Sequence, residues 1–317
     1  FVYVGNNEVY RVRQTGLWVK YGNGVVFSSN YVHNIIATQW SVSKGIGSQY
    51  KPHNLWIINN IIHDATYGIR VPSTYAVPWL KTINVIGNVI YNIHPQQRMD
   101  GTMDGWQSAR DTWQSAAMGL GGDVSNVSNN IIFDVAAGII VMSHRATASI
   151  KNNIVYNTNY MREGQPDLYG PSILFEGQAL GSTIDIQSNV FDTNMIIRRG
   201  GMTYYSLEDM TATGSINNRS GEQLFTKAEL LDAIARKDIS SLNLASLVDA
   251  GANIDSLTGA LFTDYFTHGA SINRDMFGTA RYQGASIDIG PFEQEGAEVP
   301  TTTIPLKPDG LTVIQIQ

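Results

Sequence analysis

The chain has 317 residues, no cysteine, a net charge of −6 at pH 7, and charged side chains at only 15% of its positions. The acidic balance argues against a nucleic-acid-binding protein, which needs clustered Lys and Arg. The lack of cysteine excludes disulfides and thiolate metal sites, and no apolar run approaches the roughly 18 residues that a membrane span needs. Few charges together with much Asn, Ser, Thr and Gly are typical of strands and turns rather than helical bundles.

The chain opens at Phe1, without Met and already in strand-like sequence. We therefore expect the start of the natural polypeptide to be missing, and the lack of a signal peptide does not argue for a cytoplasmic protein.

An internal repeat dominates the next 140 residues. Five segments share an apolar residue, two mostly polar or small residues, an Asn and a short apolar strand: 57–64, 85–92, 127–134, 150–157 and 186–193. With a fainter copy upstream, the aligned asparagines are Asn34, Asn60, Asn88, Asn130, Asn153 and Asn189. A fixed Asn in every repeat predicts a right-handed parallel β-helix, because coils stacked about 4.8 Å apart let each Asn bond the Asn above and below. The rival fold, an antiparallel β-sandwich, predicts strict alternation and hairpin turns such as Asn-Gly instead.

The spacing of these asparagines shows where the coils are interrupted. Successive gaps are 26, 28, 42, 23 and 36 residues, whereas a bare coil takes roughly 20–28 residues. Gly68 and Gly138 each follow an aligned Asn by eight residues, and we place Gly119 and Ser172 at the same station of the two long coils. Insertions then fall at one corner, at about 93–118 and 159–170, and such insertions often build a binding face.

The first inserted loop is rich in aromatic and charged residues. Trp106 and Trp113 either offer a stacking platform for sugar rings or, the favoured interpretation, anchor the loop to the solenoid. Arg110 lies between them as a candidate substrate contact. Asp100 and Asp104 are candidate calcium ligands, but their spacing matches no specific calcium loop, so solvated carboxylates are the favoured interpretation. No cofactor is otherwise indicated.

The second inserted loop adds Arg162 and Tyr169 as candidate substrate contacts. Beside both loops, stacking Ile69 on Leu120, Ile139 and Ile173 turns the next residues outward. That register gathers one set of side chains on the outer surface: Arg70, Asp123, His144, Arg145 and Glu176. A slip of one residue would invert the set.

Two reactions suit this predicted face. β-Elimination on a uronate needs a cation for the carboxylate, a base for the C5 proton and an acid for the leaving oxygen, which fits Arg145 and His144. Hydrolysis needs two carboxyl groups, and Asp123 and Glu176 would lie about 9.6 Å apart, compatible with an inverting arrangement. Each of these residues could instead be an ordinary solvated position, and His63 is expected, like His94, to serve a turn.

The repeat fades after residue 200. Thr226 and Glu229 form a capping-box pattern, and the apolar spacing that follows predicts an amphipathic helix over 227–238 that packs on or caps the solenoid. We therefore divide the chain into β-helix coils at 1–200, a helix and closing segment at 201–295, and an extended tail at 296–317.

The segments Leu-Val-Asp-Ala-Gly at 247–251 and Arg-Tyr-Gln-Gly-Ala-Ser-Ile-Asp-Ile-Gly-Pro-Phe-Glu at 281–293 close the helix in a familiar way. Together with the Asn-Asn-Ile coils, they resemble secreted bacterial right-handed parallel β-helix proteins of the pectate-lyase-like superfamily, over about residues 50–295. The resemblance implies a secreted or cell-surface protein that handles a polysaccharide, and we expect a monomer.

We expect a polysaccharide-active enzyme, a lyase slightly ahead of a glycoside hydrolase. The alternative is a non-catalytic glycan-binding or adhesin protein, because the superfamily includes such members and fold alone does not imply function.

Overall fold

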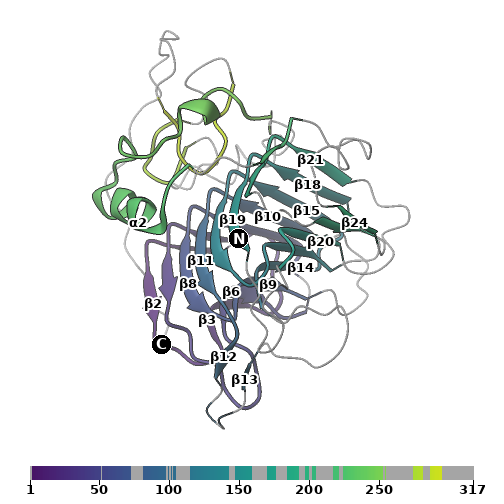
Figure 1. Ribbon diagram of the computed structural model, residues 1–317. Coiled ribbons are helices and arrows are strands. Elements are labelled where there is room, and N and C mark those ends of the chain that lie inside the picture. The colour runs from purple at the N-terminus through teal and green to yellow at the C-terminus, as the bar shows by residue number, and fades with distance from the viewer. Residues whose placement is uncertain are drawn as a thin grey trace.

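The computed structural model describes residues 2–50, 52–72, 81–97, 99, 101, 103–104, 115–142, 147–158, 170–175, 184–192, 197–199, 202–204, 217–220, 224–252, 254, 274–280 and 286–294. Over these residues the chain winds as a right-handed parallel β-helix whose three sheets run the length of the solenoid (Figure 1). The predicted fold class is confirmed. Within the same ranges no helix is long and apolar enough to cross a lipid bilayer.

Each full coil contributes one strand to each of three sheets. Sheet A contains β1 (Val2–Gly5), β4 (Val25–Ser28), β7 (Asn54–Ile58), β10 (Thr82–Ile86), β15 (Val124–Ser128), β18 (Thr147–Lys151) and β21 (Ile184–Gln187). Sheet B contains β2 (Glu8–Tyr10), β5 (Tyr31–His33), β8 (Ile61–Ala65), β11 (Val89–Ile93), β16 (Ile131–Val135), β19 (Ile154–Thr158), β22 (Val190–Phe191) and β25 (Arg219–Ser220). Sheet C contains β3 (Thr15–Val19), β6 (Lys44–Ser48), β9 (Tyr67–Val71), β14 (Ala116–Leu120), β17 (Ile139–Val141), β20 (Ile173–Phe175), β23 (Ile197–Arg199) and the antiparallel β24 (Met202–Tyr204).

The interior is filled by columns of branched apolar side chains. On sheet B, Val32, Ile62, Ile90 and Ile132 point inward from paired positions and are fully buried. Burying one such side chain stabilises the fold by roughly 1.5–3 kcal/mol. Repetition of the same column in every coil makes the solenoid interior one continuous core.

An asparagine ladder runs along the corner between sheets A and B. In each coil the backbone N–H and the Nδ2 of one Asn donate to the Oδ1 of the Asn in the next coil, at 2.9–3.2 Å. The ladder comprises Asn7, Asn30, Asn60, Asn88, Asn130, Asn153, Asn189 and Asn218. From Asn30 onward each Nδ2 also donates to a carbonyl of the preceding coil. The sequence interpretation was therefore right about the purpose of the aligned asparagines.

One member of the predicted ladder was wrong. The ladder residue of that coil is Asn30, whereas Asn34 lies beyond β5, exposed, with a φ of 52°. It belongs to a second polar column that also adopts left-handed backbone: Arg11, Asn34, Asp64, Asn92, Asp134 and Asn157. Asn is favoured both in the ladder and in left-handed turns, so the letter alone did not separate the two columns.

The two long gaps interrupt the chain between sheets B and C, as predicted. One falls between the end of β11 at Ile93 and the start of β14 at Ala116, and the other between the end of β19 at Thr158 and the start of β20 at Ile173. The first gap contains a short antiparallel hairpin of β12 (Gln96–Gln97) and β13 (Met103–Asp104).

The predicted register of the first long coil was wrong by two residues. Met118, rather than Leu120, pairs with Ile69 and Ile139. Because two residues restore the same face of a strand, Leu120 still points inward. Asp123, however, moves away from the column that was assigned to it.

The C-terminal region packs on the outer face of sheet B (Figure 1). Helix α2 (Lys227–Arg236) begins at the predicted capping box, in which the Thr226 side chain accepts from the N–H of Glu229 while the Glu229 carboxylate accepts from the N–H of Thr226. Its buried face, with Leu230 and Ala233, joins a cluster that includes outward side chains of β11, β16 and β19. A short 3-10 turn, η1 (Ala245–Leu247), follows.

Candidate functional site

The predicted face on sheet C is described only in part, and that part is mostly apolar. The Arg70 guanidinium lies 4.3 Å from the centroid of the buried Tyr67 ring. Arg70 lies between Gly47 and Gly119 in its outward column, which continues to Ile140 and Leu174, and these last two are buried in an apolar cluster. Arg70 is thus a half-buried cation at the edge of an apolar layer.

Asp123 has a structural role at a different corner. It follows Gly119 by four residues, where the chain turns into β15, and its Oδ2 accepts from the N–H of Lys81 at 2.9 Å. The buried Lys81 ammonium donates in turn to the carbonyl of Gly121. The structure therefore does not bring Asp123 and Arg70 together.

The other predicted site residues stay predictions. His144, Arg145, Glu176, Trp106, Arg110, Trp113, Arg162, Tyr169 and Asp100 lie outside the described residues, and of Asp104 only the backbone in β13 is described. Across the described part of the chain, no group of three or more His, Asp or Glu side chains is arranged to hold a metal ion.

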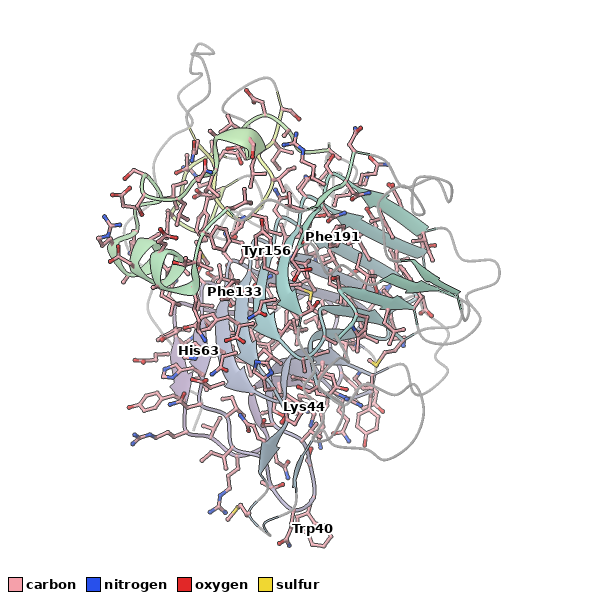
Figure 2. The ribbon with its side chains drawn as sticks, viewed as in Figure 1. Trp40, Lys44, His63, Phe133, Tyr156 and Phe191 are labelled. Atoms are coloured by element: carbon pink, nitrogen blue, oxygen red, sulfur yellow. The ribbon has the colours of Figure 1, made fainter. Side chains whose placement is uncertain are left out.

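A second candidate site lies on the outer face of sheet B. The third residue after each ladder Asn points outward there, and in six successive coils that residue carries a ring. We call this set the ring row: Tyr10, His33, His63, Tyr91, Phe133 and Tyr156, each paired with the next across adjacent strands. Figure 2 shows His63, Phe133 and Tyr156 following one another along the solenoid.

The first four rings form a continuous stack. Ring centroids are 5.3 Å apart between Tyr10 and His33, 5.0 Å between His33 and His63, and 4.5 Å between His63 and Tyr91, with interplanar angles of 5°, 13° and 16°. Tyr31, two residues before His33 on the same face of β5, leans over it, with the two ring centroids 4.3 Å apart. Strand spacing thus imposes a regular array of flat surfaces with polar edges.

A chain of hydrogen bonds crosses this stack. His63 Nδ1 lies 2.7 Å from Asp64 Oδ2, and His63 Nε2 lies 3.0 Å from the Tyr31 hydroxyl. Because the carboxylate can only accept, Nδ1 carries the imidazole proton, and Nε2 accepts from the Tyr31 hydroxyl. Asn92 Nδ2 holds the other Asp64 oxygen. The result is an ordered Asp64–His63–Tyr31 chain, and its half-exposed phenol also hydrogen-bonds the Tyr91 side chain.

Burial sets the protonation of this chain. Desolvation lowers the pKa of His63 below 6.5, although its hydrogen bond to Asp64 opposes the shift. Desolvation raises the pKa of Tyr31, and it raises the pKa of Tyr91 further. At neutral pH the imidazole of this chain is therefore neutral and its phenol protonated.

The row is open at one end and covered at the other. Tyr10 is 50% exposed and Tyr31 38%, whereas Tyr91 is only 9% exposed, and Phe225 of the C-terminal region packs against the rings of Phe133 and Tyr156.

At the boundary between the two ends, the Lys227 ammonium lies 5.9 Å from the Tyr91 ring centroid and 2.6 Å from an Asp134 oxygen. His94 binds the other oxygen at 3.2 Å, and these contacts, the one from His94 foremost, lower the pKa of Asp134 to about 2. His94 thus supports the polar column beside the row.

Comparison with known families agrees with this architecture. A family model for the right-handed β-helix region matches residues 2–218, more than half of the chain. The chain belongs to the right-handed β-helix family. No curated protein and no solved structure matches this β-helix chain significantly.

Sequence reasoning missed the ring row of this β-helix protein, although its signal is in the repeat. Counting three residues on from each ladder Asn of the first six coils always reaches a Tyr, His or Phe. The predicted outward columns lay beside the inserted loops, and His63 was predicted to serve a turn. It lies in a strand, with its ring between those of His33 and Tyr91.

Proposed function

We propose that this β-helix protein is an exported, polysaccharide-active enzyme that binds a glycan along the open end of the ring row and cleaves it. β-Elimination is slightly favoured over hydrolysis. The observation that carries the proposal is the ordered Asp64–His63–Tyr31 chain, set among ring faces on which sugars can stack.

The chain suits proton transfer. In β-elimination the Tyr31 oxygen takes the C5 proton while its own proton passes to His63 Nε2, and Asp64 stabilises the resulting imidazolium. The electrons of the C5–H bond form the C4–C5 double bond as the C4–O bond breaks. Tyr31 then protonates the leaving oxygen, and His63 returns its proton to Tyr31, so that one proton moves within the substrate and no other reactant is consumed.

Stacking and charge support the same surface. The exposed rings of Tyr10 and Tyr31 offer apolar faces to sugar rings, and between them His33, whose side chain is 13% exposed, bonds Glu8 at 3.1 Å. Lys227, which pairs with Asp134 at the boundary between the open and covered coils, supplies the cation that would neutralise a substrate carboxylate.

The alternative is non-catalytic glycan binding. It is favoured by the burial of His63, which is 8% exposed and has a partner at each ring nitrogen, so that the chain could serve only to hold the rings in place. The predicted sheet C face with His144 and Glu176 remains a rival location for cleavage.

Incubation with a panel of acidic and neutral polysaccharides separates these possibilities. Ultraviolet absorbance of an unsaturated uronate together with new reducing ends indicates a lyase, and reducing ends alone indicate a hydrolase. Retention on a polysaccharide without cleavage supports the binding alternative. A protein that is not retained on any polysaccharide of the panel and cleaves none of them would contradict the proposal. Loss of cleavage in His144→Ala with full cleavage by His63→Gln would assign the reaction to sheet C.

A further inference from the structure

An unusual amount of apolar surface is exposed at one corner of the early coils. Trp40 is 83% exposed, Met99 59% and Ile36 42%. Soluble proteins rarely leave a Trp side chain almost fully exposed to solvent, and grouped exposed apolar side chains commonly mark an interaction site. We call these three residues the Trp40 corner. Figure 2 shows Trp40 projecting beyond the ribbon at the lowest point of the view.

The turn that presents Trp40 is tightly built. Thr38 and Ser41 pair across it, with a 3.0 Å bond from the Thr38 N–H to the Ser41 carbonyl. Thr38 Oγ1 accepts from the N–H groups of Trp40 and Ser41 and from the side chain of Gln14 in the preceding coil. The Lys44 ammonium binds Ser41 Oγ at 2.7 Å. The indole is therefore held outward by an ordered turn.

Two other elements bring their exposed residues to the same corner. Ser43 donates to the Gln96 side chain at 2.8 Å, which ties the β12–β13 hairpin, with Met99 in its connection, to the strand that follows the turn. Ile36 bridges directly to Arg13 of the preceding coil. Both hairpin and turn lie at the bottom of the solenoid in the view of Figure 1.

The corner is also cationic. Arg11 and Arg13 are exposed and, within the part of the chain that the structure describes, neither forms an ion pair with a carboxylate. Residues 1–50 contain four Lys and Arg but one acidic residue, Glu8, although the whole chain carries −6. These early coils thus carry a net charge of +3 (4 − 1) in a chain of net charge −6, because acidic residues are scarce there.

We propose that the Trp40 corner docks onto an anionic lipid surface, with the indole in the headgroup layer and Arg11 and Arg13 against lipid phosphates. Trp favours the membrane–water interface, and aliphatic Met and Ile side chains gain by entering the acyl boundary. A sugar chain would use the indole but would gain little from Met99 and Ile36, so a lipid surface fits the composition better. Lipid docking would hold the protein on a membrane surface, while the ring row remains on the outer face of sheet B.

Co-sedimentation with vesicles tests this proposal. The protein should bind phosphatidylcholine vesicles that contain phosphatidylglycerol and bind pure phosphatidylcholine weakly. Trp40→Ala should weaken binding on the order of tenfold, and Arg11→Gln with Arg13→Gln should weaken it by about tenfold or more, since each surface cation contributes about 1 kcal/mol. Tyr21→Ala is the matched control, because Tyr21 is a 64% exposed aromatic stacked on Tyr50 at another corner. Trp fluorescence should shift to the blue on binding in the unmodified protein.

Three outcomes would overturn the proposal. One is equal sedimentation of Trp40→Ala and the unmodified protein. Another is sedimentation without vesicles, or a larger mass by light scattering that Trp40→Ala abolishes, which would make the corner a contact between copies. The third is loss of polysaccharide retention in Trp40→Ala with vesicle binding unchanged, which would make it a sugar platform. None of these readouts requires the protein to be an enzyme.

Discussion

Sheet B carries the same repeat throughout, yet its early and late coils present that repeat to different surroundings. In the first three coils the outward ring is Tyr10, His33 or His63, and the Tyr10 end is open to solvent. In later coils the ring is Tyr91, Phe133 or Tyr156, and the C-terminal region covers it.

The difference shows how one backbone column serves two purposes. Under the cover, the rings contribute to an apolar cluster with Leu230 and Phe225, where burial stabilises the fold. In the open coils, imidazole and phenol groups hold one another by stacking and hydrogen bonds, and the rings of Tyr10 and Tyr31 reach solvent.

Loss of a ladder Asn should be the most damaging change, because the ladder supports both kinds of coil. Asn130→Ala removes the acceptor of the Asn88 N–H and Nδ2 and three donations to neighbours, all in a fully buried site. We expect a loss of about 3–5 kcal/mol in the free energy of unfolding, measured by urea denaturation. Asn34→Ala, at an exposed position outside the ladder, should cost at most about 1 kcal/mol. Equal losses would contradict the ladder.

The covered and open halves should differ in their dependence on burial. Leu230→Ala should lower the free energy of unfolding by about 2–4 kcal/mol, because this side chain of α2 is 1% exposed where the helix packs on sheet B. Tyr10→Ala should cost about 1 kcal/mol or less, because it removes one half-exposed ring from the end of the stack. A large cost at Tyr10 would mean that the open half is not open.

At the boundary, the bonds of Asp134 should make stability depend on pH. The folded pKa near 2 lies below the ordinary 3.8, so the carboxylate stabilises the fold above about pH 4, and this contribution is lost as pH falls towards 2. Asp134→Asn should lower stability by about 1 kcal/mol at neutral pH, after allowance for partial exposure, and by progressively less in acid. Asp232→Asn, in the exposed pair with Arg236, should change stability by less than about 0.5 kcal/mol. A pH-independent difference for Asp134→Asn would exclude this account.

Much of the fold could be predicted from the sequence, because the spacing of the repeated Asn gives the length of each coil and the way the coils stack. The asparagine spacing located the coils and both interruptions, and the capping box at Thr226 located the start of α2. Asn34 was misplaced because a left-handed turn and a ladder favour the same amide. The register at Met118 was missed because the length of an inserted loop does not reveal where the next strand begins.

Less of the candidate site could be predicted from the sequence. The predicted face was chosen beside the insertions, where most candidates lie outside the described residues, while Asp123 proved to hold a corner. The Asp64–His63–Tyr31 chain joins residues from two coils, and that proximity follows only from the correct alignment of Asn30 with Asn60. The misaligned Asn34 and the assignment of His63 to a turn together concealed it.

The most direct test of the central claim, that the open ring row performs acid–base chemistry on a glycan, is the depolymerisation rate of Tyr31→Phe. This change keeps the ring but removes the hydroxyl that bonds His63. With a polysaccharide that the unmodified protein cleaves, we predict a rate at least about 100-fold lower, with retention on the polysaccharide nearly unchanged. The free energy of unfolding should fall by about 1–3 kcal/mol, because His63 Nε2 loses its donor, and the variant should remain folded. Tyr21→Phe, on a separate corner, is the control and should cleave normally. An undiminished rate for Tyr31→Phe would contradict the account.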